Sequence, residues 1–264
     1  MPEFVPAYAD RAQVFFEKQD YENALGDYSK AISLKSDESE YYYQRSIVYH
    51  KLGKNDLAIL DLNKVIDTAP DYAPAYLFRG KCNYALGKLG EALIDLTQAI
   101  SENPNNAEAF IARGDTYLAL EQIGKADSDY SRSARLRPDS PWGHYGKGKV
   151  ELARDKYSKA LKEFMKALKV DASFKQALIG IGDTYYAMRD YERALTEYET
   201  FIKSNVKSAD GYYSRGKTYY ALGRYEEADA DFKSALLLDN NHAGALKGKA
   251  ALQSKIPNKN NQTE

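Results

Sequence analysis

Small and aromatic side chains recur along the chain in a pattern that predicts pairs of packed helices. In residues 209–242 (ADGYYSRGKTYYALGRYEEADADFKSALLLDNNH), the small residues Gly216, Ala228 and Ala235 mark points where two helices approach closely. Aromatic side chains fill the space around them, at Tyr212, Tyr219, Tyr225 and Phe232. The segment therefore predicts an aromatic helix that contains glycine, followed by an alanine-rich helix.

The same pattern recurs upstream with a fixed period of 34 residues. One alanine of the second helix is present in every copy: Ala24, Ala58, Ala92, Ala126, Ala160, Ala194 and Ala228. No insertion or deletion breaks the phase between Val5 and His242, which predicts seven repeats, at 5–38, 39–72, 73–106, 107–140, 141–174, 175–208 and 209–242. A period of this length indicates an array of stacked units, not one spherical core.

In its period, its aromatic-glycine first helix and its alanine-rich second helix, the chain resembles the tetratricopeptide repeat family. The resemblance implies an all-α fold, a right-handed superhelical solenoid of seven helix-turn-helix repeats. It also implies that the first helices line the concave surface, where ligands of this family usually lie. Residues 243–256 predict one more first helix, and its polar side chains Lys247, Lys249 and Gln253 suit a solvating C-terminal cap.

Capping signals and the chain ends complete the predicted organisation. Ser39 is a predicted helix N-cap, and Asn106 and Ser140 follow proline-containing turns as caps of the next helices. Residues 1–4 (MPEF) stop where the first repeat begins and are compatible with a vector-derived remnant. Residues 257–264 lack apolar periodicity and are predicted to be disordered.

A small residue occupies the eighth place of every repeat, counted from the first residue of that repeat. Glycine in the middle of a helix costs about 1 kcal/mol relative to alanine. Its recurrence at one phase therefore predicts a packing role, because a larger side chain would push the paired helices apart. The residues are Ala12, Ser46, Gly80, Gly114, Gly148, Gly182 and Gly216.

A second register couples charges between the two helices of a repeat. Cations occupy the seventh place: Arg11, Arg45, Arg79, Arg113, Lys147 and Arg215. Acids occupy the twenty-third: Asp27, Asp61, Asp95, Asp129, Glu163, Glu197 and Asp231. We expect a ladder of ion pairs that Ile181 interrupts in the sixth repeat. Structural pairing is favoured over a charged strip for a ligand.

Composition and charge bound the classes of function. Lys+Arg 37 against Asp+Glu 38 gives a formal net charge of −1, so no field of one sign attracts nucleic acid or an anionic membrane. No apolar run approaches the roughly 20 residues that cross a bilayer, which predicts no direct membrane insertion. The start of the chain lacks a signal peptide and favours the cytoplasm, with a trimmed signal or anchor left open.

No group of residues predicts an active site, a cofactor or a metal. Residues 143–150 (GHYGKGKV) fit G-x-x-x-x-G-K, but valine stands where the magnesium ligand belongs, and Gly148 is the eighth-place residue of its repeat. His50, His144 and His242 lie in three different repeats. Cys82 is the single cysteine, and its sequence neighbours offer no base, so we expect a small buried apolar residue and a protein that is not an enzyme.

The family resemblance assigns the fifth, ninth and twelfth places of the first helices to the concave face. Tyrosine is abundant there and suits binding through a large contact area with a polar tip. The alternative reading is that these residues pack against adjacent helices. The candidate partner-binding residues at these places are Tyr43, Leu77, Lys81, Tyr84, Ile111, Asp115, Tyr145, Lys149, Ile179, Asp183, Tyr186, Tyr213, Lys217 and Tyr220. Trp142, at the start of the fifth repeat's first helix and close to the rim of this face, is a further candidate.

The ninth-place charges alternate in sign from Lys81 to Lys217, which predicts a groove without preference for a highly acidic or basic partner. The lysine and asparagine pattern by which co-chaperone repeats grip a C-terminal carboxylate is absent, since no ninth place is asparagine.

Two hypotheses of function follow. The first is a non-enzymatic adaptor that holds a peptide or helix of another protein in the concave groove. The alternative is a structural protein that self-assembles end to end or through the convex face, suggested by the apolar start of the chain with Phe4, Val5, Phe15 and Phe16.

Overall fold

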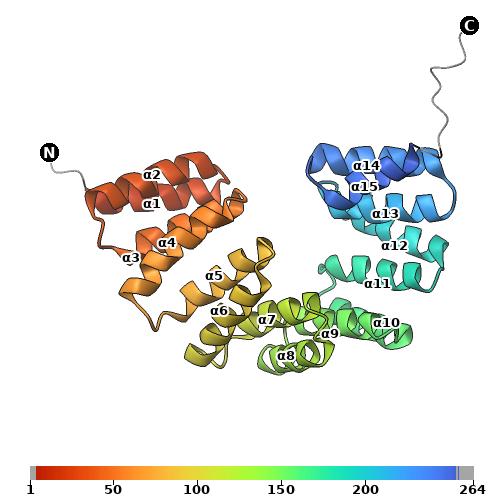
Figure 1. The fold of residues 1–264 in the computed structure, drawn as a ribbon, viewed down its shortest axis with the longest axis horizontal. Helices are drawn as coiled ribbons and strands as arrows, with labels where there is room; N and C mark the ends of the chain where they lie inside the picture. The colour runs from red at the N-terminus through yellow and green to blue at the C-terminus, as the bar shows by residue number, and fades with distance from the viewer. Residues whose placement is uncertain (1–3, 254, 256–264) are drawn as a thin grey trace, which may run out of the picture. The chain divides into compact units, whose positions relative to one another are not determined.

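The computed structural model describes residues 4–253 and 255. These residues form two compact units, of which unit 1 ends at Arg137 and unit 2 begins at Pro138. The described residues contain α-helices and no β-strand (Figure 1). The predicted remnant at 1–4 and tail at 257–264 lie outside the described residues, apart from Phe4. No helix in the described part of the chain is long and apolar enough to span a bilayer.

Unit 1 consists of four helix pairs. Their helices are α1 (Val5–Glu17), α2 (Tyr21–Leu34), α3 (Ser39–Lys51), α4 (Asn55–Thr68), α5 (Ala73–Ala85), α6 (Leu89–Glu102), α7 (Ala107–Ala119) and α8 (Ile123–Leu136). Each first helix packs against the second helix of its own pair, and α3, α5 and α7 also pack against the second helix of the preceding pair. First helices also contact one another, as α5 does α7.

Unit 2 repeats this order with three pairs and one additional helix. Its helices are α9 (Trp142–Ala153), α10 (Tyr157–Val170), α11 (Gln176–Ala187), α12 (Tyr191–Ser204), α13 (Ala209–Ala221), α14 (Tyr225–Leu238) and α15 (Ala243–Leu252). The first helices α9, α11, α13 and α15 contact each other in succession. Helix α15 packs on α14, where Leu252 and Ala245 join the core cluster of Phe232.

The recurring alanines and glycines lie at the helix–helix contacts, as predicted. All seven phase-marking alanines are fully buried. A Cβ atom added to Gly148 would lie 2.5 Å from the Phe164 ring, and one added to Gly182 would lie 2.6 Å from the Tyr198 ring. The eighth place is therefore small because the residue at the twenty-fourth place of the same repeat covers it.

Each repeat turns between its two helices through one residue in the left-handed backbone region. Glycine holds this place in three repeats, with φ of 72–76° at Gly53, Gly87 and Gly223. Non-glycine residues hold it in the others, with φ of 57–61° at Gln19, Glu121, Asp155 and Arg189. The shared backbone turn, not the side chain, defines this place.

The predicted helix caps are partly wrong. The Asn106 side chain accepts hydrogen bonds from the backbone N–H groups of Glu108 and Ala109, as expected. Ser39 is instead the first residue of α3, and its hydroxyl contacts Thr68 Oγ1 at 2.8 Å. Helix α9 begins after Pro141, so Ser140 does not cap it.

Candidate functional site

The first helices of each unit present a continuous set of partly exposed aromatic and charged side chains. We call the surface formed by the fifth, ninth and twelfth places of these helices the first-helix face. In unit 1 it comes from α1, α3, α5 and α7, and in unit 2 from α9, α11 and α13. Neighbouring first helices of unit 2 contact one another in succession; in unit 1, α5 contacts α7, and Tyr43 of α3 packs against Phe78 of α5.

In unit 1 the first-helix face contains Tyr43, Lys81, Tyr84, Ile111 and Asp115. The Tyr43 ring lies 5.5 Å from that of Tyr72, and burial raises the pKa of Tyr43 to about 12. Tyr84 is 41% exposed. Lys81 forms an ion pair with Glu108 of α7, the next first helix.

Leu77 does not belong to this surface. Only 8% of it is exposed, and it packs in the core cluster with Leu96, Ala99 and Ala109. It therefore offers almost no area to a partner and is a core residue, contrary to the expectation from its fifth place.

In unit 2 an aromatic cluster lies at the start of the first-helix face. Trp142 is 42% exposed and its ring centroid lies 4.7 Å from that of Phe174 and 6.0 Å from that of Tyr145. Lys149 Nζ lies 5.3 Å from the centroid of the Tyr145 ring. The tryptophan therefore reports on the part of the face formed by α9.

Further along unit 2, tyrosines of the face pack against neighbouring rings and stay partly exposed. Tyr186 lies 5.4 Å from Tyr191, and Tyr220 lies 5.5 Å from Tyr225. Tyr213 contacts Phe232 at 6.1 Å and His242 at 4.9 Å, measured between ring centroids. Ile179, seven residues before Tyr186 on α11, is also partly exposed.

The type of residue at the ninth place of a repeat follows the type at its twenty-fourth place. Wherever the twenty-fourth place of a repeat is tyrosine, the tyrosine hydroxyl donates a hydrogen bond to the ninth-place side chain of that repeat. The three bonds join Tyr28 to Gln13 at 3.2 Å, Tyr130 to Asp115 at 2.6 Å and Tyr198 to Asp183 at 2.6 Å. Where it is leucine or phenylalanine, the ninth place is isoleucine or lysine: Ile47 over Leu62, Lys81 over Leu96, Lys149 over Phe164 and Lys217 over Phe232. Asp115 and Asp183 therefore serve as acceptors for buried hydroxyl groups.

The environment of Asp183 disfavours its charge. Burial raises the pKa of the Asp183 carboxyl, although the hydrogen bond from Tyr198 and the charge of Lys217 act in the opposite direction. Burial and the neighbouring carboxylate raise the pKa of Tyr198 as well. The Tyr198 hydroxyl thus remains the donor at neutral pH.

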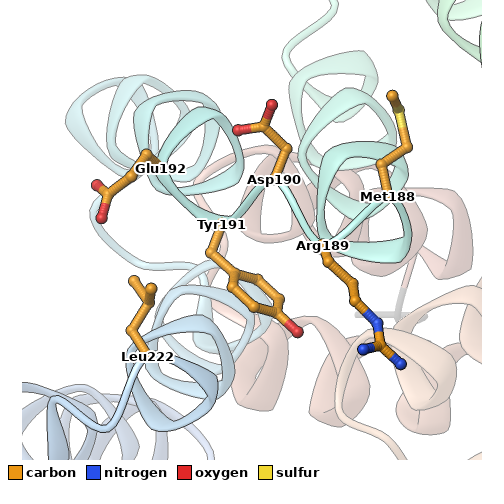
Figure 2. A pocket seen from close by; sticks show the side chains of 6 residues that line it. All are labelled: Met188, Arg189, Asp190, Tyr191, Glu192 and Leu222. Atoms are coloured by element: carbon orange, nitrogen blue, oxygen red, sulfur yellow. The ribbon is translucent and has the colours of Figure 1, made fainter.

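Two shallow depressions are lined by residues that are not among the candidate partner-binding residues. One, of about 380 Å³, is lined by the turn between α11 and α12, the start of α12 and the residue after α13, with Met188, Arg189, Asp190, Tyr191, Glu192 and Leu222 (Figure 2). Asp190 caps α12 and pairs with Arg193, so its carboxylate is already engaged. The other, of about 270 Å³, is lined by Phe4, Ala7, Tyr8 and Arg11. Neither holds a group arranged for chemistry.

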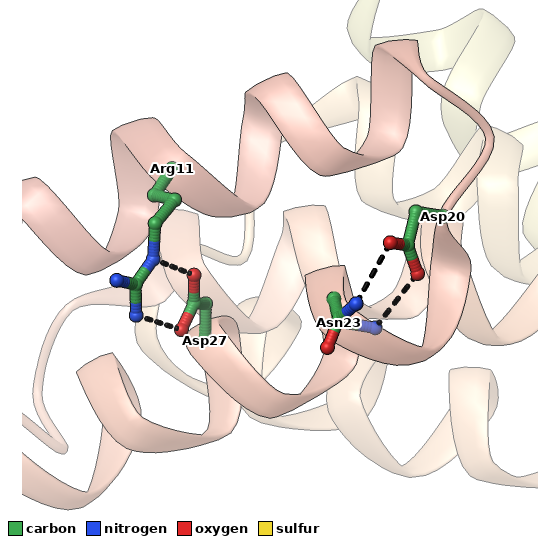
Figure 3. Close-up of polar contacts among 4 residues, drawn as sticks. All are labelled: Arg11, Asp20, Asn23 and Asp27. Atoms are coloured by element: carbon green, nitrogen blue, oxygen red, sulfur yellow. Dashed lines mark hydrogen bonds and ion pairs between the residues drawn. The ribbon is translucent and has the colours of Figure 1, made fainter.

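The predicted ladder of ion pairs is present. Arg11 donates through Nε to Asp27 Oδ2 at 2.6 Å and through Nη2 to Asp27 Oδ1 at 2.8 Å (Figure 3). The same two-bond geometry joins Arg45 to Asp61, Arg79 to Asp95, Arg113 to Asp129 and Arg215 to Asp231. Three of these arginines also reach the second helix of the preceding repeat, at Ser29, Asn63 and Thr97. The ladder therefore links helices both within and between repeats.

The ladder changes in repeats five and six. Glu163 accepts from His144 Nδ1 at 2.8 Å and Lys166 Nζ at 2.6 Å, so the expected direct pair with Lys147 is replaced. Burial works against the charge, but these hydrogen bonds hold the pKa of Glu163 below its ordinary value. In repeat six Ile181 replaces the arginine, and burial alone raises the pKa of Glu197.

The structure brings His50 close to Cys82, which the sequence did not indicate. His50 Nδ1 lies 3.8 Å from Cys82 Sγ and 2.6 Å from Asn55 Oδ1. Cys82 is nevertheless fully buried, and burial raises the pKa of its thiol to about 12. The thiol is therefore protonated at neutral pH and inaccessible, which does not suit a nucleophile.

Among the described residues no group of three or more His, Cys, Asp or Glu side chains is arranged to hold a metal ion. The glycines of 143–150 lie at and within α9, and Gly148 packs on Phe164 in the middle of that helix. This segment therefore lacks the strand–loop–helix geometry of a phosphate-binding loop.

Comparison with family models gives matches along most of the chain. A model described as tetratricopeptide repeat matches residues 43–107, 111–177 and 179–245, and one described as TPR repeat matches residues 12–53. Comparison with curated proteins gave no match.

Solved structures share the fold at low sequence identity. A tetratricopeptide repeat protein from Parabacteroides merdae is 20% identical, with a TM-score of 0.81 over 94% of this chain and 98% of its own. MamA from Desulfovibrio magneticus is 22% identical, with a TM-score of 0.59 over 66% and 98%. PilW, a type IV pilus biogenesis factor, is 17% identical, with a TM-score of 0.67 over 78% and 95%.

Proposed function

Because the chain belongs to the tetratricopeptide repeat family, whose repeats generally mediate protein–protein interactions, we propose that it is a non-enzymatic adaptor that binds a partner on its first-helix face. The partner is a peptide or helix of another protein. Partly exposed tyrosines on this face and the half-exposed Trp142 beside it carry the proposal, because such side chains supply large contact areas with few rotatable bonds.

The part of the face around Trp142 is suited to a direct test. Peptides selected from a displayed library against the whole chain would be titrated while the fluorescence of Trp142, the single tryptophan, is followed. Replacing Tyr145 by alanine removes a ring that contacts Trp142 and is expected to weaken binding by about tenfold.

A matched variant separates binding from folding. Tyr157 begins α10, a second helix, and its hydroxyl contacts Asp155 in an exposed turn. Tyr157→Ala removes the same kind of side chain outside the first-helix face and is expected to leave peptide affinity unchanged. Equal losses in both variants, or none in Tyr145→Ala, would exclude the first-helix face of α9 as the binding surface.

Self-assembly is the second candidate, and one observation favours it. On the second helices of unit 1, Leu60 is 62% exposed and Ile94 is 72% exposed, both at the twenty-second place of their repeats. Such exposed apolar side chains suit contacts between copies. Light scattering over a concentration series, on the wild type and on Leu60→Glu/Ile94→Glu, tests it. A monomer at all concentrations would rule out this candidate.

A further inference from the structure

The ammonium group of Lys217 on the first-helix face forms no direct ion pair with an acid among the described residues, although its charge reaches Asp183. Its Nζ lies 4.1 Å from the centroid of the Tyr186 ring, across from α13 to α11. No hydrogen bond or ion pair joins it to any residue that the structure describes. An ammonium group has three strong donors, and a ring face satisfies its charge but not those donors.

The same place in another repeat shows how such a lysine is satisfied. Lys81 and Lys217 are both ninth-place residues, and Lys81 pairs with Glu108 at the second place of the next repeat. The residue equivalent to Glu108 after Lys217 is Gly244. A Cβ atom there would lie 2.5 Å from Cζ of Tyr213, so the Tyr213 ring occupies the space that a side chain at this place would need. The protein therefore cannot supply this acid to Lys217 from α15.

The acids near Lys217 are engaged elsewhere. Asp183 accepts the hydroxyl of Tyr198 at 2.6 Å, and burial raises the pKa of its carboxyl. Asp210, whose charge also reaches Asp183, lies 3.1 Å from Nε2 of His242. Tyr186 and Tyr213 are further titratable side chains next to these groups, since Tyr186 lies against Lys217 and Tyr213 against His242. Lys217 is therefore left without a direct ion pair or hydrogen bond to these groups.

We propose that Lys217 binds an acidic side chain of the partner and thereby selects acidic segments, with Tyr186 and Tyr213 as the adjoining aromatic surface. The partner carboxylate takes the role toward Lys217 that Glu108 has toward Lys81. This inference rests on the proposed function of the first-helix face. It differs from the neutral groove expected from alternating ninth-place signs, because Asp183 accepts the Tyr198 hydroxyl while the Lys217 ammonium has no hydrogen-bond acceptor among the described residues.

Three fluorescently labelled decapeptides test the charge preference directly. They alternate leucine with glutamate, glutamine or lysine, and their affinities for the full chain would be measured by fluorescence anisotropy at low salt. We expect the glutamate peptide to bind more tightly than the glutamine peptide, and the lysine peptide to bind most weakly. This preference should fall as salt is raised, because a partly exposed ion pair is screened.

Substitutions assign the preference to one residue. Lys217→Gln should lower the affinity for the glutamate peptide by about tenfold and leave the affinity for the glutamine peptide unchanged. Lys217→Arg keeps the positive charge and should retain the affinity for the glutamate peptide. Asp183→Asn keeps an acceptor for Tyr198, removes the nearby negative charge and should strengthen the glutamate peptide several-fold. Lys203→Gln removes a positive charge from an exposed position on α12 and controls for net charge.

The outcomes separate the inference from the function on which it rests. Equal binding of the glutamate and glutamine peptides, or an unchanged affinity in Lys217→Gln, overturns the acidic preference and leaves first-helix binding standing. Tighter binding of the lysine peptide than of the glutamate peptide also overturns it. If Asp183→Asn then lowers the affinity for the lysine peptide, Asp183 is the residue that sets the preference. Absence of binding by all three peptides up to about 1 mM, a very weak affinity, overturns it too. Library-selected peptides that lose affinity in Tyr145→Ala would then still support the proposed function.

Discussion

Two carboxyl groups at the same place in neighbouring repeats should respond in opposite ways to loss of their charge. Asp231 and Glu197 both occupy the twenty-third place and lie on α14 and α12 of unit 2. Asp231 receives two hydrogen bonds from Arg215, at 2.8 and 2.7 Å, whereas Glu197 has Ile181 at the place of the arginine. We predict that Asp231→Asn destabilises the protein and that Glu197→Gln does not.

The magnitude for Asp231 follows from its burial and its bonds. Its side chain is 6% exposed and that of Arg215 is 21% exposed. Asparagine can accept only one of the two bonds and presents an amide donor to the other guanidinium N–H. Breaking a fully buried pair costs about 3–5 kcal/mol, and a charged hydrogen bond contributes about 1.5–3 kcal/mol. Because the guanidinium is partly hydrated, we expect a loss of about 2 kcal/mol.

Glu197→Gln removes a charge that the fold disfavours. Burial raises the pKa of Glu197 in the folded state. At neutral pH the ionised carboxylate is therefore less favourable in the folded than in the unfolded chain, and it lowers the stability of the fold. The group is partly exposed, and solvent screening limits the gain from glutamine to a few tenths of a kcal/mol. The advantage of glutamine should shrink as the pH falls through the folded pKa and vanish below about 4, where glutamate is protonated in both states.

Urea unfolding of both variants, followed by Trp142 fluorescence in unit 2 and by circular dichroism, measures the difference. Two probes are needed because repeat arrays can unfold in more than one step. A loss of stability in Glu197→Gln as large as that in Asp231→Asn would refute the reasoning, since it would mean that the native state uses the Glu197 charge. An advantage of glutamine that grew toward acidic pH would refute the assigned direction of the pKa shift.

Further predictions concern packing, backbone and reactivity. Tyr198→Phe should cost about 1–2 kcal/mol in unfolding free energy, because it leaves the Asp183 carboxyl without its 2.6 Å donor, and thermal unfolding at neutral pH measures it. Gly223→Ala should lower the unfolding free energy by about 1 kcal/mol, because φ is 76° at this residue and alanine disfavours that region. Gly124→Ala on α8 should raise it by about 0.5–1 kcal/mol, because nothing lies within 4 Å of the added Cβ and alanine favours the helix. The two variants should therefore shift the urea midpoint in opposite directions. The Cys82 thiol should react with an aromatic disulfide reagent at least about 100-fold more slowly in the native than in the urea-unfolded protein at pH 8, because it is fully buried and its pKa is about 12; fast native reaction would contradict its burial.

Much of the fold was predictable because each repeat uses the same few contacts at the same phase. The burial of Ala58 and its equivalents, the packing at Gly148 and the pairing of Arg11 with Asp27 all follow from a period that the sequence displays directly. The acceptor for a buried tyrosine was also readable, since it lies 15 residues before each of Tyr28, Tyr130 and Tyr198. That spacing would have shown that Asp115 and Asp183 have structural partners.

By itself, the sequence determined the repeat phase and the contacts between the two helices of a repeat, because those helices are close in sequence and every copy repeats their relation. Only the tertiary structure decided the contacts between repeats. The angle between successive helix pairs brings His50 to Cys82, buries Leu77 and places Lys217 over Tyr186. Such contacts depend on side-chain volumes in two repeats at once, as the Tyr213 ring over Gly244 shows, and no periodicity within one repeat encodes them.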